Sequence, residues 1–113
     1  MALPLNVFKT VTKVAPIEPV GIYTAPTGYS SVVLLAQASN IGEITYDISF
    51  SHQRTISGIA VTTEIVKDFS IPSNDSVNLL FGRLVLEQGD ALILSASDSE
   101  NIKFIGSILE TLN

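Results

Sequence analysis

The chain has 113 residues, of which 46% are hydrophobic and 15% are charged, and this length fits one domain with its own core. It contains no cysteine, which excludes a disulfide scaffold, a zinc-thiolate site, an iron–sulfur cluster and a cysteine nucleophile. Its formal net charge of −5 argues against binding through the phosphates of a nucleic acid.

The first 19 residues predict an extended segment. Asn6–Val14 is rich in β-branched residues, which indicates a strand, and Pro16 and Pro19 interrupt the connection that follows it. This segment is either the first strand of the domain formed by residues 20–113 or an arm that lies on a neighbouring subunit. The residues expected to contact a partner are Val7, Lys9, Val11 and Lys13. As part of an ordinary edge strand, the two lysines would only be solvated.

The next elements are also β-strands. Val20–Thr24 forms a short strand, and Ala25–Gly28 is a turn rich in proline and glycine. Ser31–Ser39 follows, and its first half is apolar on both faces, which is typical of a strand covered on both sides.

The clearest alternation of the chain runs from Ile44 to Ser51. Apolar residues occupy every second position, with small or polar residues between them. This pattern predicts a strand with one face on a core. The polar stretch His52–Gly58 then predicts an exposed loop.

Ile59–Ile71 is a second long β segment. A short helix at Thr63–Phe69 is an alternative, but the β-branched content favours a strand. Pro72–Ser76 then predicts a turn.

Three strands complete the chain. Leu84–Leu86 and Ala91–Ser97 flank a hairpin loop in which Gly89 supplies a positive φ. Ile102–Leu112 follows the turn Asp98–Asn101, and Gly106 within it indicates a bulge or a close approach of another chain segment. Its apolar residues lie on both faces: Ile102, Phe104 and Ile108 on one, and Ile105 and Leu109 on the other.

Seven to nine strands without a long helix predict an all-β fold. The turn spacing indicates a single antiparallel β-sandwich of the jelly-roll or immunoglobulin-like type, with an extended segment at 1–19 and the sandwich at 20–113.

Charged residues are scarce, since soluble domains average about 25%. The surplus of apolar strand surface favours contact with other subunits or partners, although a neutral, Ser/Thr-rich surface on a monomer is the alternative. Met1–Phe8 lacks the pattern of a signal peptide, and the longest apolar run, Val32–Ala36, is far below the ~20 residues of a membrane span. We therefore expect no membrane partner.

No catalytic pattern emerges. His52, the single histidine, follows Ser51, but no G-x-S-x-G elbow is present, so a surface histidine is the better interpretation. Acidic residues cluster in turns, where solvation explains them: Asp75, Glu87, Asp90, Asp98 and Glu100. A calcium site from Asp75, Asp90 or Asp98 would lack the usual loop motif. We expect no enzymatic activity and no cofactor.

Tyrosines offer a candidate sugar-binding site. Tyr23 and Tyr29 flank a turn and are candidate glycan contacts, whereas Tyr46 belongs to the alternating core face. Tryptophan, the preferred stacking residue for sugars, is absent.

Four stretches carry a resemblance to a protein family. Ile22–Asn40 contains a Tyr-Thr-x-Pro-x-Gly turn that leads into an apolar strand, and Phe69–Ser97 contains Ile-Pro, Leu-Leu-x-Gly and Leu-x-Leu-Glu-x-Gly-Asp in that order. These resemble small β-sandwich virion structural proteins of tailed bacteriophages. Ala2–Lys13 and Ser107–Asn113 are most similar to those of myoviruses that infect marine cyanobacteria.

The resemblance implies a virion component without enzymatic activity, made in the host cytoplasm. Our leading hypothesis is a capsid decoration or accessory protein that stabilises the particle surface through apolar strand faces. Its partners would be the major capsid or tail protein and further copies of itself, with a trimer as the predicted oligomer. The alternative is a glycan- or receptor-binding module of a tail or fibre.

Overall fold

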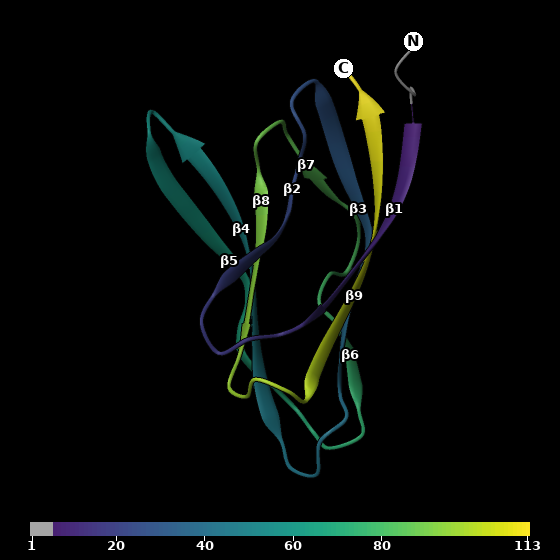
Figure 1. Ribbon diagram of the computed structural model, residues 1–113, viewed down its shortest axis with the longest axis vertical. Coiled ribbons are helices and arrows are strands. Elements are labelled where there is room, and N and C mark those ends of the chain that lie inside the picture. Colours follow the sequence, from purple (N-terminus) through teal and green to yellow (C-terminus); the bar gives the residue numbers. More distant parts are fainter. Residues whose placement is uncertain (1–5) are drawn as a thin grey trace.

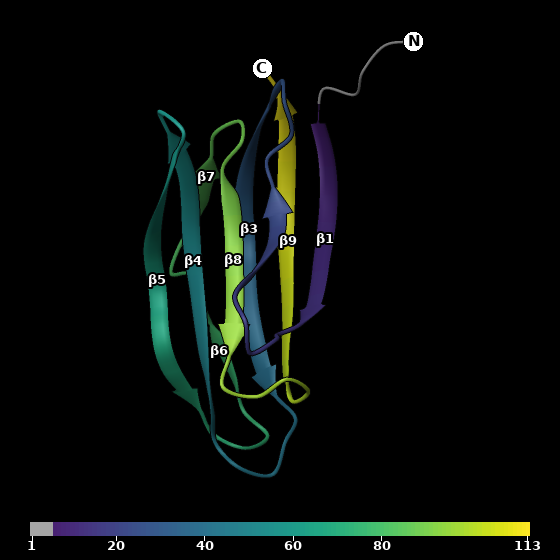
Figure 2. The same ribbon diagram turned by 60° about the vertical axis from the view of Figure 1, so that its left-hand side comes forward.

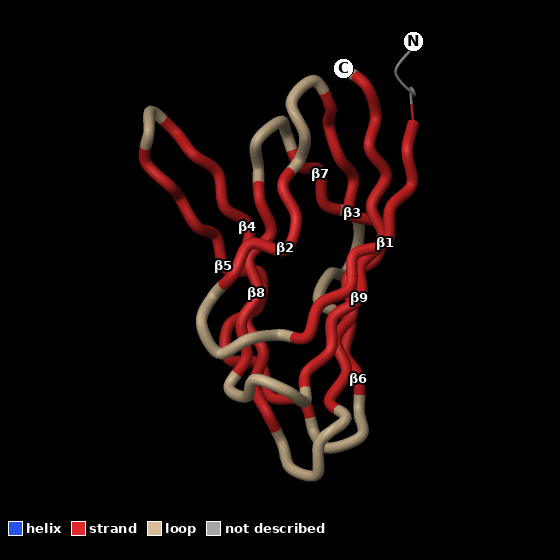
Figure 3. Tube along the Cα trace, in the orientation of Figure 1, coloured by secondary structure: helices blue, strands red, loops and turns tan. Residues whose placement is uncertain are grey.

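The computed structural model describes residues 6–113, which form nine strands in two antiparallel sheets and no helix (Figure 1, Figure 3). Sheet A consists of β1 (Asn6–Val14), β9 (Ile102–Leu112), β3 (Tyr29–Asn40), β6 (Ser76–Asn78) and β7 (Leu84–Leu86). Sheet B consists of β2 (Val20–Thr24), β8 (Ala91–Ala96), β4 (Tyr46–Ile56) and β5 (Ile59–Ile71). The two sheets stack as the layers of the predicted β-sandwich (Figure 2).

The core lies between the two sheets and is built by alternation along the strands. Ile48 and Phe50 point inward from β4, and Leu92 and Leu94 do so from the neighbouring β8. The predicted inward face of β9 is confirmed, because Ile102, Phe104 and Ile108 are all buried. The rings of Phe50 and Phe104 meet across the two layers, with centroids 5.5 Å apart.

Sheet A has the order β1-β9-β3, and β6 and β7 share the far edge of β3. β1 pairs with β9 of its own chain over its full length, from Asn6–Thr111 to Val14–Lys103. β1 therefore forms one edge of the sheet. An exchange of this segment between subunits stays a prediction.

Gly106 lies where two backbones come close together. A Cβ atom at this position would be 3.0 Å from the Phe104 ring and 3.3 Å from the Leu35 carbonyl oxygen. The predicted close approach is confirmed, and the ring of Phe104 fills the space that a side chain would take.

The alternation that begins at Ile44 predicted the start of the strand wrongly. β4 starts only at Tyr46, and Ile44 is 61% exposed in the preceding loop. Asn40 explains this start, because its buried side-chain amide donates to the carbonyl oxygens of Ile44 and Ile71 and thereby holds the loop against the end of β5.

The expected exposed loop at His52–Gly58 is also wrong. β4 continues to Ile56, and the turn is only Ser57-Gly58, where both residues have positive φ. β4 and β5 thus form a long hairpin that projects from the sandwich (Figure 1). Polar residues extend the strand here because their side chains find partners: His52 and Arg54 contact Asp90, and Gln53 donates to Thr62.

The remaining strands largely match the expectation. β5 is a strand rather than a helix, and Gly89 has φ 87° in the β7–β8 turn. β6 was not predicted, because its three residues follow directly on the predicted turn Pro72–Ser76 and are too few to show a period.

Candidate binding surfaces

Four apolar side chains form one row across the outer face of sheet A. The register places Phe8 of β1 opposite Leu109 of β9. It then places Val32 of β3 between Leu109 and Val85 of β7. Directly opposed residues of neighbouring strands share a face, so the row spans the whole sheet. Phe8 is 74% exposed and Val85 57%, so no other part of residues 6–113 covers them.

A bulge in β3 enlarges this row. The pairing with β9 shifts between Val33 and Leu35. Val33 and Ala36 are both buried, and regular alternation would leave one outward residue between two inward ones. Here Leu34 and Leu35 lie between them, 36% and 39% exposed. The extra residue therefore adds a second leucine to the outer surface.

We call this surface the apolar face; its members are Phe8, Val14, Val32, Leu34, Leu35, Val85, Ile105 and Leu109. Within the described strands, Lys103 is the one charged residue at an outward position of sheet A. A sheet face exposed to water normally carries polar residues. The expectation that the apolar first half of β3 is covered on both sides is therefore wrong within residues 6–113.

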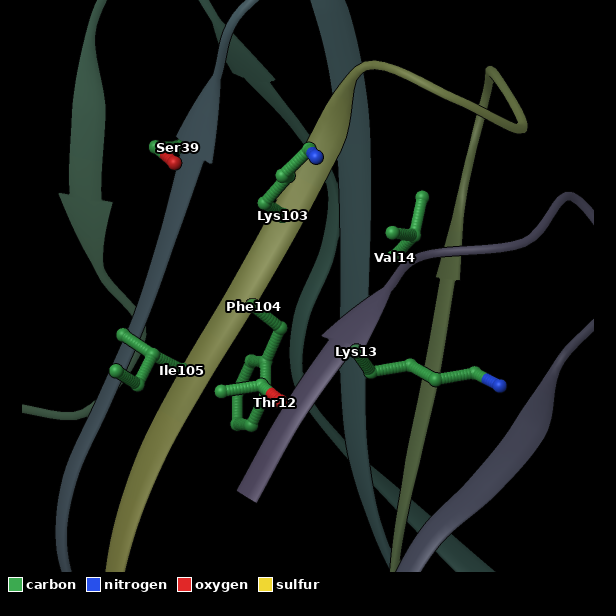
Figure 4. A pocket seen from close by; sticks show the side chains of 7 residues that line it. All are labelled: Thr12, Lys13, Val14, Ser39, Lys103, Phe104 and Ile105. Carbon is green, nitrogen blue, oxygen red and sulfur yellow. The ribbon is translucent and has the colours of Figure 1, made fainter. Parts of the chain in front are cut away.

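A groove of about 620 Å³ lies at one end of the apolar face (Figure 4). It runs over β9 between β1 and β3, and the side chains that line it are Thr12, Lys13, Val14, Ser39, Lys103, Phe104 and Ile105. The exposed side chains of Val14 and Ile105 make it largely apolar, whereas the ring of Phe104 lies in the core. The Lys103 side chain lies over β9, whereas that of Lys13 extends away from β9, beyond the edge of β1 (Figure 4).

The predicted partner residues lie on the other side of β1. Val7, Lys9, Val11 and Lys13 are opposite the inward positions of β9, from Glu110 to Phe104. The structure therefore brings them together on the core side of the edge strand, where Val11 packs against the core. A role for the four residues as a partner contact stays a prediction.

Lys9 belongs to a polar cluster that joins sheet A to β2 of sheet B. Its ammonium lies 3.3 Å from Oε2 of Glu110, which is almost fully buried. Tyr23 of β2 donates its hydroxyl proton to the same carboxylate oxygen at 2.5 Å and lies 2.8 Å from the Ser31 hydroxyl. Burial, followed by the hydrogen bond to Glu110, raises the pKa of the Tyr23 phenol well above its usual value. This cluster ties β1, β2, β3 and β9 together.

The two candidate glycan tyrosines are both half-buried. The hydroxyl of Tyr23 points into the sandwich, toward Glu110, rather than outward as expected from the turn beside it. Tyr29 begins β3, and its backbone amide donates to the Pro26 carbonyl oxygen. Glycan binding at these residues stays a prediction.

A second polar cluster links β4 to the β7–β8 turn. Asp90 is 1% exposed and accepts hydrogen bonds from Arg54, from Nε at 2.8 Å and Nη2 at 2.6 Å. Nε2 of His52 lies 3.0 Å from Oδ2, and the Glu87 amide donates to the same oxygen. The Arg54 guanidinium, with His52 and the Glu87 amide, holds the pKa of the Asp90 carboxyl far below its usual range.

This cluster corrects two expectations. His52 lies on β4 with its side chain 17% exposed, not in a surface loop, and Asp90 is buried rather than solvated. Sequence order did not indicate the contact, because 36 residues separate Arg54 from Asp90. Within residues 6–113, no serine hydroxyl is bonded to His52, so the Ser-His-Asp arrangement of a hydrolase is not formed. The cluster holds the β7–β8 turn against β4.

No three His, Cys, Asp or Glu residues of the described chain gather as metal ligands. Asp98 accepts bonds from the amides of Glu100 and Asn101, which lower the pKa of its carboxyl and close the β8–β9 turn. Residues 6–113 also contain no helix with the length and apolar character of a membrane span.

Comparison with known proteins gives a likeness of fold. No protein-family model and no curated protein matches the chain. A chain of the T13 particle of infectious bursal disease virus matches 97% of this chain with a TM-score of 0.60 and 9% identity, and a chain of the Gx strain matches 96% with 0.57 and 12%. Each match covers 32% of the viral chain, so this protein spans about a third of their length.

A protein of the disulfide-linked pili that form Bacillus endospore appendages shares the same architecture. It matches 96% of this chain and 88% of its own length, with a TM-score of 0.50 and 14% identity. The β-sandwich described above is thus a fold found in proteins that assemble into virus particles and into pili.

Proposed function

We propose that this chain is a non-enzymatic structural protein of a virus particle, and more specifically a decoration or accessory protein of a tailed-phage head. It binds the particle surface through the apolar face. The observation that carries this proposal is that the outer side of sheet A holds a continuous apolar row, from Phe8 to Val85, that no part of residues 6–113 covers. The fold shared with proteins of assembled particles supports it.

The size of the apolar face suits a specific contact. β9 has 11 residues, and four strands lie side by side, so at about 3.3 Å per residue and about 4.8 Å per strand the sheet measures roughly 36 by 19 Å. This is roughly 700 Å², close to the ~800 Å² that each partner contributes to a standard interface. Apolar residues at the centre of the face and few charges are also typical of the core of an interface.

The proposed mechanism is passive. A protein that binds the assembled lattice, but not its separated subunits, stabilises the lattice by mass action. The partner is then the major capsid protein or, in the tail, a tail protein. Contacts between copies, and the trimer expected from the sequence, remain proposals that light scattering after gel filtration checks directly.

Immunogold labelling of purified particles of the virus that encodes this chain tests the proposal, together with mass spectrometry of the same particles. We expect dense label over the head and peptides of this chain in many copies per particle. Label confined to the tail or fibres contradicts the decoration role. Absence of both label and peptides contradicts a virion role altogether.

A further inference from the structure

The rest of the chain holds β1 through one edge only. β1 is the outermost strand of sheet A, and β9 is the one strand of residues 6–113 with which it pairs (Figure 2). None of its nine residues is buried, and only Val7 and Val11 are half-buried. The buried apolar core begins with Ala15, directly after β1. Departure of β1 from the sandwich would therefore remove no core residue.

The edge of β9 beneath β1 has a defined chemistry. Glu110 of β9 is 3% exposed, and Lys9 of β1 is the one cation of residues 6–113 that pairs with its carboxylate. A nearly buried carboxylate that loses its cation destabilises the fold. Val11 lies opposite Gly106, which has no side chain, and packs against the core. A strand on this edge must therefore carry a cation and an apolar residue two positions apart, as β1 does with Lys9 and Val11.

We propose that this edge is an acceptor site for the β1 strand of a second copy, so that copies join by strand exchange. A second copy supplies the same backbone register, the same lysine for Glu110 and the same valine beside Gly106. Exchange of an identical element between protomers is a low-cost route to oligomers for this reason. Strand exchange does not depend on the function proposed above.

The connection after β1 suits an arm that turns outward. The Ala15 amide donates to the Ile102 carbonyl oxygen, and the Ala96 amide donates to the Pro16 carbonyl oxygen, each at 2.8 Å. These bonds fix the base of β1 at the end of the sandwich where β9 begins. An arm that turns outward at Val14 therefore leaves the end of its own sandwich and reaches a copy placed end to end, whose β9 it meets in the antiparallel direction.

Two single-cysteine variants of the full chain test the exchange, because the sequence contains no cysteine. Thr10 and Ser107 lie opposite each other across β1 and β9. Thr10→Cys and Ser107→Cys are mixed, unfolded in urea, refolded together and oxidised. A disulfide between residue 10 of one chain and residue 107 of the other forms where the arm lies on the neighbour. We expect its yield, measured by mass spectrometry of tryptic peptides, to rise with protein concentration.

A matched pair controls for random collisions. Ser39 and Lys103 lie opposite each other across β3 and β9, which do not exchange, so Ser39→Cys mixed with Lys103→Cys is the control. The disulfide between residues 10 and 107 should be about tenfold more abundant than the control disulfide, because exchange holds the two residues together. Equal yields of the two, or unlinked chains at every protein concentration, overturn the proposal. Thermal unfolding verifies that all four variants are folded.

The chemistry of the acceptor edge has its own test. Val11→Asp in the full chain weakens its own arm, and the acetylated, amidated peptide of residues 6–14 should then bind the vacated edge and shift the backbone amides of residues 103–111. The same peptide with Lys9→Glu should have a Kd about tenfold higher, since it places a carboxylate beside Glu110. Equal affinities of the two peptides overturn the acceptor site. If Val11→Asp does not fold, the cysteine mixtures decide alone.

Both experiments use the isolated chain without any particle. Failure of the decoration role would appear instead in the labelled particles, so the two proposals fail separately.

Discussion

The outer faces of the two sheets differ in whether their side chains find partners within the described residues. On sheet B, opposed polar side chains bond to one another: the Ser70 hydroxyl donates to Asp47 at 2.8 Å, and the Gln53 amide donates to Thr62 at 3.1 Å. On sheet A, the equivalent positions carry the apolar face, and the row from Phe8 to Val85 meets no cover from residues 6–113. These polar side chains on the outer face of sheet B therefore find partners within the described residues, whereas the apolar row of sheet A finds no cover among them.

The buried carboxylate Asp90 also differs from the apolar face in having its partners within the described residues. Asp90 lies on the sheet B side and has its oxygens occupied by Arg54, His52 and a backbone amide. These contacts stabilise the fold, and they leave the Asp90 carboxylate without a free oxygen for a partner. We therefore expect substitutions on the apolar face to weaken binding to the particle, and substitutions at Asp90 to weaken the stability of the fold.

The largest expected effect comes from a charge placed in the middle of the apolar face. Leu109→Asp puts a carboxylate between Phe8 and Val32, where a bound partner would remove it from water. Co-sedimentation with particles that lack this protein should show binding weakened by roughly a hundredfold, with the melting temperature little changed. Ile93→Asp is the matched control, because Ile93 is also half-buried but faces outward on sheet B. Equal loss in both variants would remove the distinction between the faces.

The second prediction is a loss of stability without a loss of binding. Asp90→Asn leaves Arg54 and His52 without their carboxylate, and urea denaturation should show a loss of about 2 kcal/mol of stability, less than for a fully buried pair because Arg54 is partly exposed. Asp47→Asn, on the outer face of sheet B, should cost under about 0.5 kcal/mol. Particle binding should be unchanged in both. An unaltered unfolding midpoint in Asp90→Asn would show that the cluster does not hold the fold.

The acid response follows from the lowered pKa of Asp90. A carboxylate whose pKa is lower in the folded than in the unfolded chain stabilises the fold above about pH 4, and this contribution is lost as the pH falls further. Between about pH 5 and pH 2, the wild type should therefore lose more stability than Asp90→Asn. Parallel curves from denaturation at each pH would contradict the assignment.

The smallest expected effect concerns the bulge in β3. Deletion of Leu34 leaves Leu35 alone between the inward Val33 and Ala36, so regular alternation returns. The variant should fold with a stability change under about 1 kcal/mol, and particle binding should weaken by roughly threefold because one leucine is lost. Deletion of Gln37 is the control, since it turns the buried Asn40 outward and should prevent folding. An insoluble Leu34 deletion would mean that the bulge is required by the fold itself.

Local patterning was enough to predict the class of fold. Alternation in Tyr46–Phe50 and in Ile102–Ile108 correctly identified core faces, because the two-residue period of a strand depends only on the chain itself. The two-sided apolar character of β3 and β9 was also visible, and it was the signal for the apolar face. What the pattern could not show was that one side has no cover within the described chain.

The candidate sites required contacts that sequence order does not contain. The row of Phe8, Leu109, Val32 and Val85 joins four strands, and its members meet only through the register of sheet A. Likewise, the cluster at Asp90 depends on the end of β4 lying beside the β7–β8 turn, so His52 and Asp90 were both misjudged as solvated surface groups. Composition, turns and periodicity are local properties and determined the β-sandwich; burial and ionisation depend on which distant strands become neighbours, and only the tertiary structure decided them.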